Sequence, residues 1–241
     1  MRRPIALLLL AWAVFVGRVA CADGIPTDAN IVTGLDFSGS IDPHDAQVQI
    51  DGITMAIRSP QIIAAIKSGN HGRVGFAVFV WASGNHPILL TWRQIASPEE
   101  AAAVADEVEM GLRALFGSEA LVKLGALTDL SSAMEYGAAM LRAAPFASDH
   151  RFVNIVGNGI DNVGEGARPV RDRLVAEGIT INGVALGRDR TLFAYLKRDV
   201  IGGPDSFALM ADDPEKLVEV MLRKFMSEIA FNAAGADQPL R

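Results

Sequence analysis

The clearest structural signal in this sequence lies between residues 31 and 40, which read Ile31-Val-Thr-Gly-Leu-Asp-Phe-Ser-Gly-Ser40. The apolar, mostly branched residues at its start predict a buried strand over 31–36. An aspartate and two serines follow at alternate positions, Asp36, Ser38 and Ser40. These side chains offer only hard oxygen ligands, which suit Mg²⁺, Mn²⁺ or Ca²⁺ better than zinc or copper. The alternative interpretation is a solvated Ser/Gly turn after a strand.

Strand-like and helix-like segments alternate along the rest of the chain. Short β-branched or aromatic runs predict strands over 31–36, 74–81, 88–92, 151–156, 179–186 and 206–210. Longer periodic runs rich in Ala, Leu and Met predict helices over 45–59, 61–66, 98–115, 128–144, 166–177, 192–199 and 214–231. This alternation predicts an α/β fold with a doubly wound, mostly parallel central sheet and helices on both faces. The turn Gly84-Asn85-His86-Pro87 predicts a hairpin, and so one antiparallel edge strand.

The first 22 residues have the layout of a secretory signal peptide. Arginines precede an apolar stretch over 5–16, and Ala20-Cys21-Ala22 forms a small-x-small cleavage site before Asp23. The apolar stretch is shorter than the roughly 20 residues that a membrane span needs. We therefore expect a periplasmic or secreted protein with no stable membrane insertion after cleavage. An uncleaved anchor is the alternative.

A second alternative is a lipoprotein with an acyl group on Cys21. Arg18 argues against it, because lipoprotein signals usually carry an apolar residue at that position. Cleavage after Ala22 would leave a mature chain without cysteine, so the fold would not depend on disulfides.

Charge and length bound the class of protein further. The formal net charge is −6, and removing the signal segment, which holds three arginines and no acidic residue, lowers it to −9. Such a chain is a poor partner for nucleic acid or anionic membranes, and it attracts divalent cations. We expect one domain over residues 23–231, followed by a disordered tail over 232–241 that is rich in Ala, Gly and Pro.

The pattern Asp36-x-Ser38-x-Ser40 resembles the metal-ion-dependent adhesion site (MIDAS) of von Willebrand factor type A (VWA) domains. In that family, three loops at the carboxyl edge of the sheet converge on one cation. The resemblance implies that Thr128, at the start of a helix, belongs to the second loop. It also implies that Asn158, in the Gly-Asn-Gly sequence after strand 151–156, belongs to the third.

Asn158 departs from the family pattern, which has an aspartate before the glycine. An asparagine still offers a carbonyl oxygen or holds a bound water, but it brings no negative charge. Losing one of two carboxylates should weaken binding of a hard cation. Asp161 is an alternative source of that charge, and Asp42 and Asp129 are candidates for an outer shell. The other interpretation of Asn158 is a plain turn residue.

The resemblance covers roughly residues 30–231. Four further segments look like a family of uncharacterised secreted bacterial VWA-like proteins that carry a signal peptide. These segments are 72–82, 158–162, 178–186 and 200–207.

Enzyme signatures are missing from this sequence. It has no Gly-x-x-x-x-Gly-Lys-Ser/Thr phosphate loop, no Gly-x-Ser-x-Gly nucleophile elbow and no His-Glu-x-x-His. One rival constellation stays open, a serine hydrolase with Ser38 or Ser40 as nucleophile beside Asp42 and His44, because triads are recognised by geometry.

The resemblance implies a non-enzymatic, exported protein-binding module. Mg²⁺, or else Mn²⁺ or Ca²⁺, would be bound by Asp36, Ser38, Ser40, Thr128 and Asn158, weakly because of Asn158. The ion would capture an acidic side chain of a partner protein. A VWA-shaped scaffold without bound metal is the second alternative.

Overall fold

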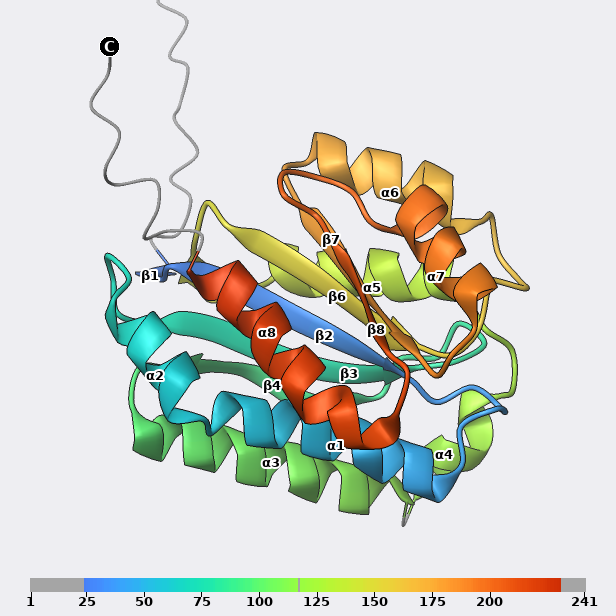
Figure 1. Cartoon of the computed structure of the whole chain (residues 1–241), viewed down its shortest axis with the longest axis horizontal. Coiled ribbons are helices and arrows are strands. Elements are labelled where there is room, and N and C mark those ends of the chain that lie inside the picture. The colour runs from blue at the N-terminus through green and yellow to red at the C-terminus, as the bar shows by residue number, and fades with distance from the viewer. Residues whose placement is uncertain (1–23, 117, 231–241) are drawn as a thin grey trace, which may run out of the picture.

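The computed structural model describes residues 24–116 and 118–230, and its central feature is a six-stranded sheet of order β4-β3-β2-β6-β7-β8 (Figure 1). These strands are β2 (Ala29–Asp36), β3 (Val74–Trp81), β4 (Ile88–Ile95), β6 (Arg151–Gly157), β7 (Thr180–Leu186) and β8 (Ala208–Ala211). A small second sheet pairs β1 (Ile25–Pro26) with β5 (Phe146–Ala147). The predicted signal peptide and the predicted tail lie outside the described residues.

Neighbouring strands of the large sheet run parallel, except for β3 and β4. The antiparallel β3–β4 pair confirms the predicted hairpin and puts β4 at one edge of the sheet. Parallel strands all end at the same edge, so the loops that follow β2, β6 and β7 gather there. That edge carries the candidate site.

Helices cover both faces of the sheet (Figure 1). One face holds α1 (Pro43–Ile57), α2 (Pro60–Lys67), α3 (Pro98–Phe116) and α8 (Leu217–Ile229) over one apolar cluster. The other face holds α5 (Leu130–Arg142), α6 (Ala167–Ala176) and α7 (Arg190–Tyr195) over a second cluster. The expected doubly wound α/β fold is confirmed. Of the helices in the part of the chain that the structure describes, none is long and apolar enough to cross a membrane.

The central strands are apolar on both sides for a physical reason. All eight residues of β2 and all eight of β3 are buried, because helices cover both faces of the sheet. Several helix starts are set locally by side chains that accept backbone N–H groups. Asp42 caps α1 by accepting the N–H of Asp45 at 2.8 Å, and Asp129 caps α5 by accepting that of Ser132 at 3.0 Å.

Several short elements differ from the sequence expectation. A six-residue helix, α4 (Glu119–Leu124), follows α3 and has no counterpart among the predicted elements. The predicted helix over 192–199 is split into α7 and a π-helical turn, η1 (Leu196–Val200). The C-terminal helix begins with a 3₁₀ turn, η2 (Pro214–Lys216). These pieces are too short to produce a clear periodicity.

Helix α8 carries a charged pair into the core. Nζ of Lys224 lies 2.5 Å from Oε1 of Glu228, and both side chains are fully buried. Glu228 also accepts hydrogen bonds from the side chains of Asn182 on β7, at 2.7 Å, and Asn154 on β6, at 3.3 Å. Burial lowers the pKa of Lys224, and the charge of Glu228 opposes that shift. This network joins α8 to two strands of the sheet.

Candidate metal centre

Asp36 is the last residue of β2 and is completely buried. Its Oδ1 accepts the backbone N–H of Ser38 at 2.8 Å, and its Oδ2 accepts that of Asn158 at 3.3 Å. Burial raises the pKa of Asp36, while the hydrogen bonds from Ser38 and Asn158 act in the opposite direction. The carboxylate therefore joins the loop after β2 to the loop after β6.

The two serine hydroxyls lie next to each other and meet the loop after β6. The Oγ atoms of Ser38 and Ser40 are 3.3 Å apart, and Oγ of Ser40 donates to Oδ1 of Asn158 at 2.7 Å. Neighbouring oxygen ligands around a six-coordinate Mg²⁺ or Ca²⁺ are about 3–3.4 Å apart, given metal–oxygen distances of about 2.1–2.4 Å. The spacing of the two hydroxyls fits adjacent ligand positions on such an ion.

Thr128 lies in the loop before α5 and is held by Asn162. Its backbone N–H donates to Oδ1 of Asn162 at 3.0 Å, and its carbonyl accepts the N–H of Asn162 at 3.0 Å. The side chain is buried, and it adjoins the third loop. A Cβ placed on Gly159 would lie 2.8 Å from Oγ1 of Thr128.

The two glycines beside Asn158 explain how the loops approach so closely. A Cβ on Gly157 would lie 2.8 Å from Oδ2 of Asp36, closer than real Cβ atoms come. Gly159 faces the same restriction from Thr128. The Gly-Asn-Gly sequence therefore lets the third loop pack against both other loops. The sequence alone indicates only a turn or a ligand position here.

The structure brings all five predicted site residues to one edge of the sheet. Direct hydrogen bonds link Asp36, Ser38, Ser40 and Asn158, and Thr128 adjoins Gly159. In residues 24–116 and 118–230, no group of three or more His, Cys, Asp or Glu side chains is arranged to hold a metal. A site built mainly from neutral hydroxyls and one carboxylate is not of that kind.

The three other acidic candidates have local structural roles. Asp42 and Asp129 are helix caps, and Asp129 also accepts from Oγ of Ser131 at 2.9 Å. Asp161 accepts the N–H of Leu130 through Oδ1 at 2.8 Å, whereas its Oδ2 is buried without a partner among the described groups. Burial, more than the charge of Asp129, raises the pKa of Asp161 to about 6.

The geometry does not support the hydrolase constellation. Asp42 is occupied as a cap, and His44 is exposed on α1. In the described structure no hydrogen bond joins His44 to either serine, and Ser40 donates to Asn158 instead.

Sequence reasoning missed Gln49, a buried residue of α1. Its Nε2 donates to the backbone carbonyl of Asp36 at 3.0 Å, so the helix holds the end of β2 in place. A polar residue at a core position of an otherwise apolar helix face was the available signal. Both tryptophans of the β3–β4 hairpin are packing residues: Trp81 is buried, and the indole N–H of Trp92 donates to the backbone carbonyl of Met140 at 3.0 Å.

Residues 26–233 match one protein family, described as "Protein of unknown function (DUF1194)". The chain belongs to this family. No curated protein sequence matches it.

Solved structures show that this DUF1194 chain has a VWA-like fold. The pilus adhesin SpaC from Lactobacillus rhamnosus GG is 12% identical, with a TM-score of 0.60, over 87% of this chain and 31% of that one. Proximal thread matrix protein 1 (PTMP1) from the mussel byssus, with a zinc-occupied MIDAS motif, is 14% identical, with a TM-score of 0.54, over 85% and 46%. The SpRpn10 VWA domain is 10% identical, with a TM-score of 0.55, over 82% and 95%. This chain thus spans about a third to a half of the adhesin and the matrix protein.

Proposed function

We propose that this protein is an exported, non-enzymatic binding module that captures a carboxylate of a partner protein through a divalent cation. The observation that carries the proposal is the hydrogen-bonded cluster of Asp36, Ser38, Ser40 and Asn158 at the carboxyl edge of the sheet. Hydroxyl and amide oxygens from the loops after β2 and β6 meet there, and the buried hydroxyl of Thr128 adjoins the second of these loops at Gly159. Such a group of hard oxygen ligands suits a divalent cation. Adhesin and MIDAS-bearing matrix proteins share the fold, which favours the same interpretation.

The five side chains would divide between two roles. The hydroxyls of Ser38, Ser40 and Thr128 would be direct ligands, and Asp36 and Asn158 would hold waters or orient the hydroxyls. The bound cation supplies an electrophilic centre for an incoming carboxylate. Because the hydroxyls are neutral, they leave most of the ion's charge available to that carboxylate.

Hard oxygen ligands favour Mg²⁺, with Mn²⁺ or Ca²⁺ as alternatives. The zinc in the mussel protein belongs to that protein's MIDAS motif. With one carboxylate near the cation rather than two, affinity should be weak. The scaffold without metal is the competing hypothesis.

Calorimetric titration of the purified protein with Mg²⁺ and Mn²⁺ separates these two hypotheses. We expect saturable heat that Asp36→Asn abolishes and that Asp51→Asn, a change of equal charge on the solvent side of α1, leaves intact. The absence of heat at millimolar metal would favour the scaffold hypothesis. Labelling of Ser38 or Ser40 by a fluorophosphonate probe would instead support the serine-hydrolase interpretation.

Export is tested separately. The protein isolated from its host should begin at Asp23 without an acyl group. A lipid found on Cys21 by mass spectrometry would overturn the proposed localisation.

A further inference from the structure

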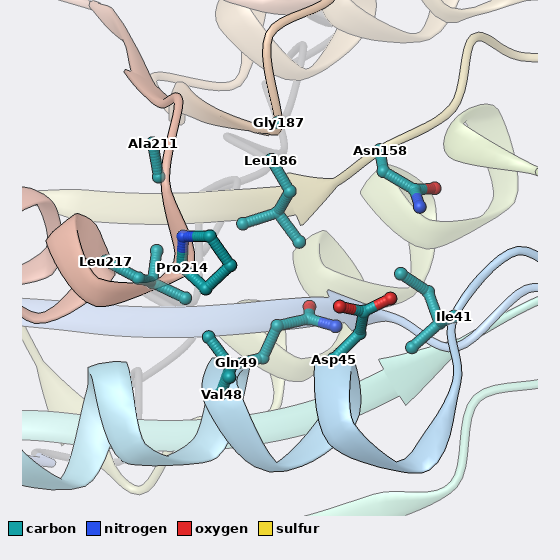
Figure 2. A pocket seen from close by; sticks show the side chains of 10 residues that line it. All are labelled: Ile41, Asp45, Val48, Gln49, Asn158, Leu186, Gly187, Ala211, Pro214 and Leu217. Carbon is teal, nitrogen blue, oxygen red and sulfur yellow. The ribbon is translucent and has the colours of Figure 1, made fainter.

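A cavity of about 200 Å³ lies beside the candidate metal centre, between α1, the end of β7 and the segment leading into α8 (Figure 2). Most of its wall is apolar. The lining residues are Ile41, Asp45, Val48, Gln49, Asn158, Leu186, Gly187, Ala211, Pro214 and Leu217. Asn158 belongs both to this wall and to the candidate metal centre, so a ligand at one site is next to the other.

Gln49 lines this cavity and carries an unsatisfied acceptor. Its Nε2 donates to the carbonyl of Asp36, and because a carbonyl can only accept, the orientation of the amide is fixed. The other amide atom, Oε1, is buried and accepts no hydrogen bond from any described group. The residue as a whole is only 1% exposed. A buried acceptor without a partner is costly, so such an atom calls for a donor from outside the chain.

Asp45 supplies a second acceptor and a negative charge. Its carboxylate lines the cavity one helical turn before Gln49, and Figure 2 shows both side chains directed into the space above α1. The structure gives this carboxylate no hydrogen bond or ion pair within the described residues. None of the ten lining residues is basic. The cavity therefore combines apolar walls with a polar end that contains an unfilled acceptor and an unpaired negative charge.

We propose that this cavity is a specificity pocket for a basic side chain, lysine or arginine, of the partner protein. Apolar walls suit the methylene stem of such a side chain, and the acceptors of Asp45 and Gln49 suit its cationic end. This inference rests on the proposed function for the identity of the partner: the basic residue would lie close to the acid that reaches the cation. The partner would then be recognised by a neighbouring acid and base.

The pocket is tested without metal, so that its outcome does not depend on the cation. The ¹⁵N-labelled protein is titrated in EDTA with n-butylammonium, and 1-butanol serves as the uncharged probe of similar shape. We expect saturable shifts of the Gln49 side-chain amide and of the Gly187 backbone amide with butylammonium. Butanol should bind about fivefold more weakly, because a hydrogen bond to a charged group is worth roughly 1 kcal/mol more.

Three variants test which residues bind the butylammonium ion. Asp45→Asn should remove the preference for butylammonium, whereas Asp51→Asn on the same helix should keep it. Val48→Phe should fill the cavity and abolish the shifts, while thermal unfolding checks that it folds. Equal affinity for both probes in the wild type, or no saturable shift at all, would overturn the proposal even if Mg²⁺ binds. Conversely, butylammonium shifts as expected, together with no heat in the Mg²⁺ titration, would contradict only the metal hypothesis.

Discussion

The hydroxyl of Ser40 donates a hydrogen bond of 2.7 Å to Oδ1 of Asn158, although 118 residues separate the two in the chain. Asn158 also donates its backbone N–H to Asp36. The residue that departs from the family pattern is thus bonded to two of the predicted ligands. Its amide stands where a second carboxylate would add charge.

Replacing Asn158 with aspartate should strengthen cation binding. The new carboxylate adds negative charge beside hard oxygen ligands, and a tenfold gain in affinity corresponds to roughly 1.4 kcal/mol. Because the ion binds only the folded state, Mg²⁺ should raise the melting temperature more in Asn158→Asp than in the wild type. Asn70→Asp, at the opposite end of the sheet, is the control for added charge. An unchanged response in a folded variant would exclude Asn158 and make Asp161 the better candidate.

The hydroxyl of Thr128 can be removed with little change of shape. Thr128→Val should lower Mg²⁺ affinity by about tenfold or more, since a charge-assisted contact is worth roughly 1.5–3 kcal/mol. Thr128→Ser, which keeps the hydroxyl, should retain most of the affinity. Calorimetry measures both. Equal binding by the valine and serine variants would mean that Thr128 is not a ligand.

The raised pKa of Asp161 predicts that the stability of the folded protein depends on pH. Its pKa rises from 3.8 to about 6 on folding, so the folded state holds the proton more tightly. The resulting stabilisation is fully present below about pH 4 and is lost as pH rises through about 6. Its size should be on the order of 2 kcal/mol, after allowance for partial exposure.

Urea unfolding of the wild type and Asp161→Asn across this window measures the effect. Other carboxyl groups titrate there too, so the difference between the two proteins is the diagnostic quantity. Asp161→Asn should lose less stability between pH 4 and 7. Parallel curves for the two proteins would contradict the assignment.

The buried pair on α8 should be sensitive to removal of one partner only. Lys224→Met leaves the carboxylate of Glu228 buried without its cation and should cost about 3–5 kcal/mol of unfolding free energy. The double variant Lys224→Met/Glu228→Gln should recover most of that loss, because no net charge then stays buried. The control is the exposed pair Lys123–Glu119, in which Nζ of Lys123 lies 3.0 Å from Oε2 of Glu119. Lys123→Met should cost less than about 1 kcal/mol of unfolding free energy. A small loss of unfolding free energy in Lys224→Met would show that water reaches this pair in the core.

Much of the fold could be predicted from local patterns. Apolar runs such as Val74–Trp81 are long and unbroken because the strand is covered on both faces, and the helix starts carry capping aspartates and prolines. Periodicity was uninformative for α4 and for η1, which are too short to show it. Their position follows from packing against neighbouring elements.

By itself, the sequence determined the order of the longer strands and helices and the chemistry available at the strand ends. Hydrophobic periodicity is a local property, so it survives without the structure. Only the tertiary structure decided which of these groups meet. It paired Ser40 with Asn158 and buried Lys224 beside Glu228. It also placed Gln49, whose side-chain oxygen has no partner among the described groups, in the wall of a cavity. Such contacts depend on the parallel pairing of β2 with β6 and on the docking of α1 and α8 on one face, and no local pattern encodes those long-range arrangements.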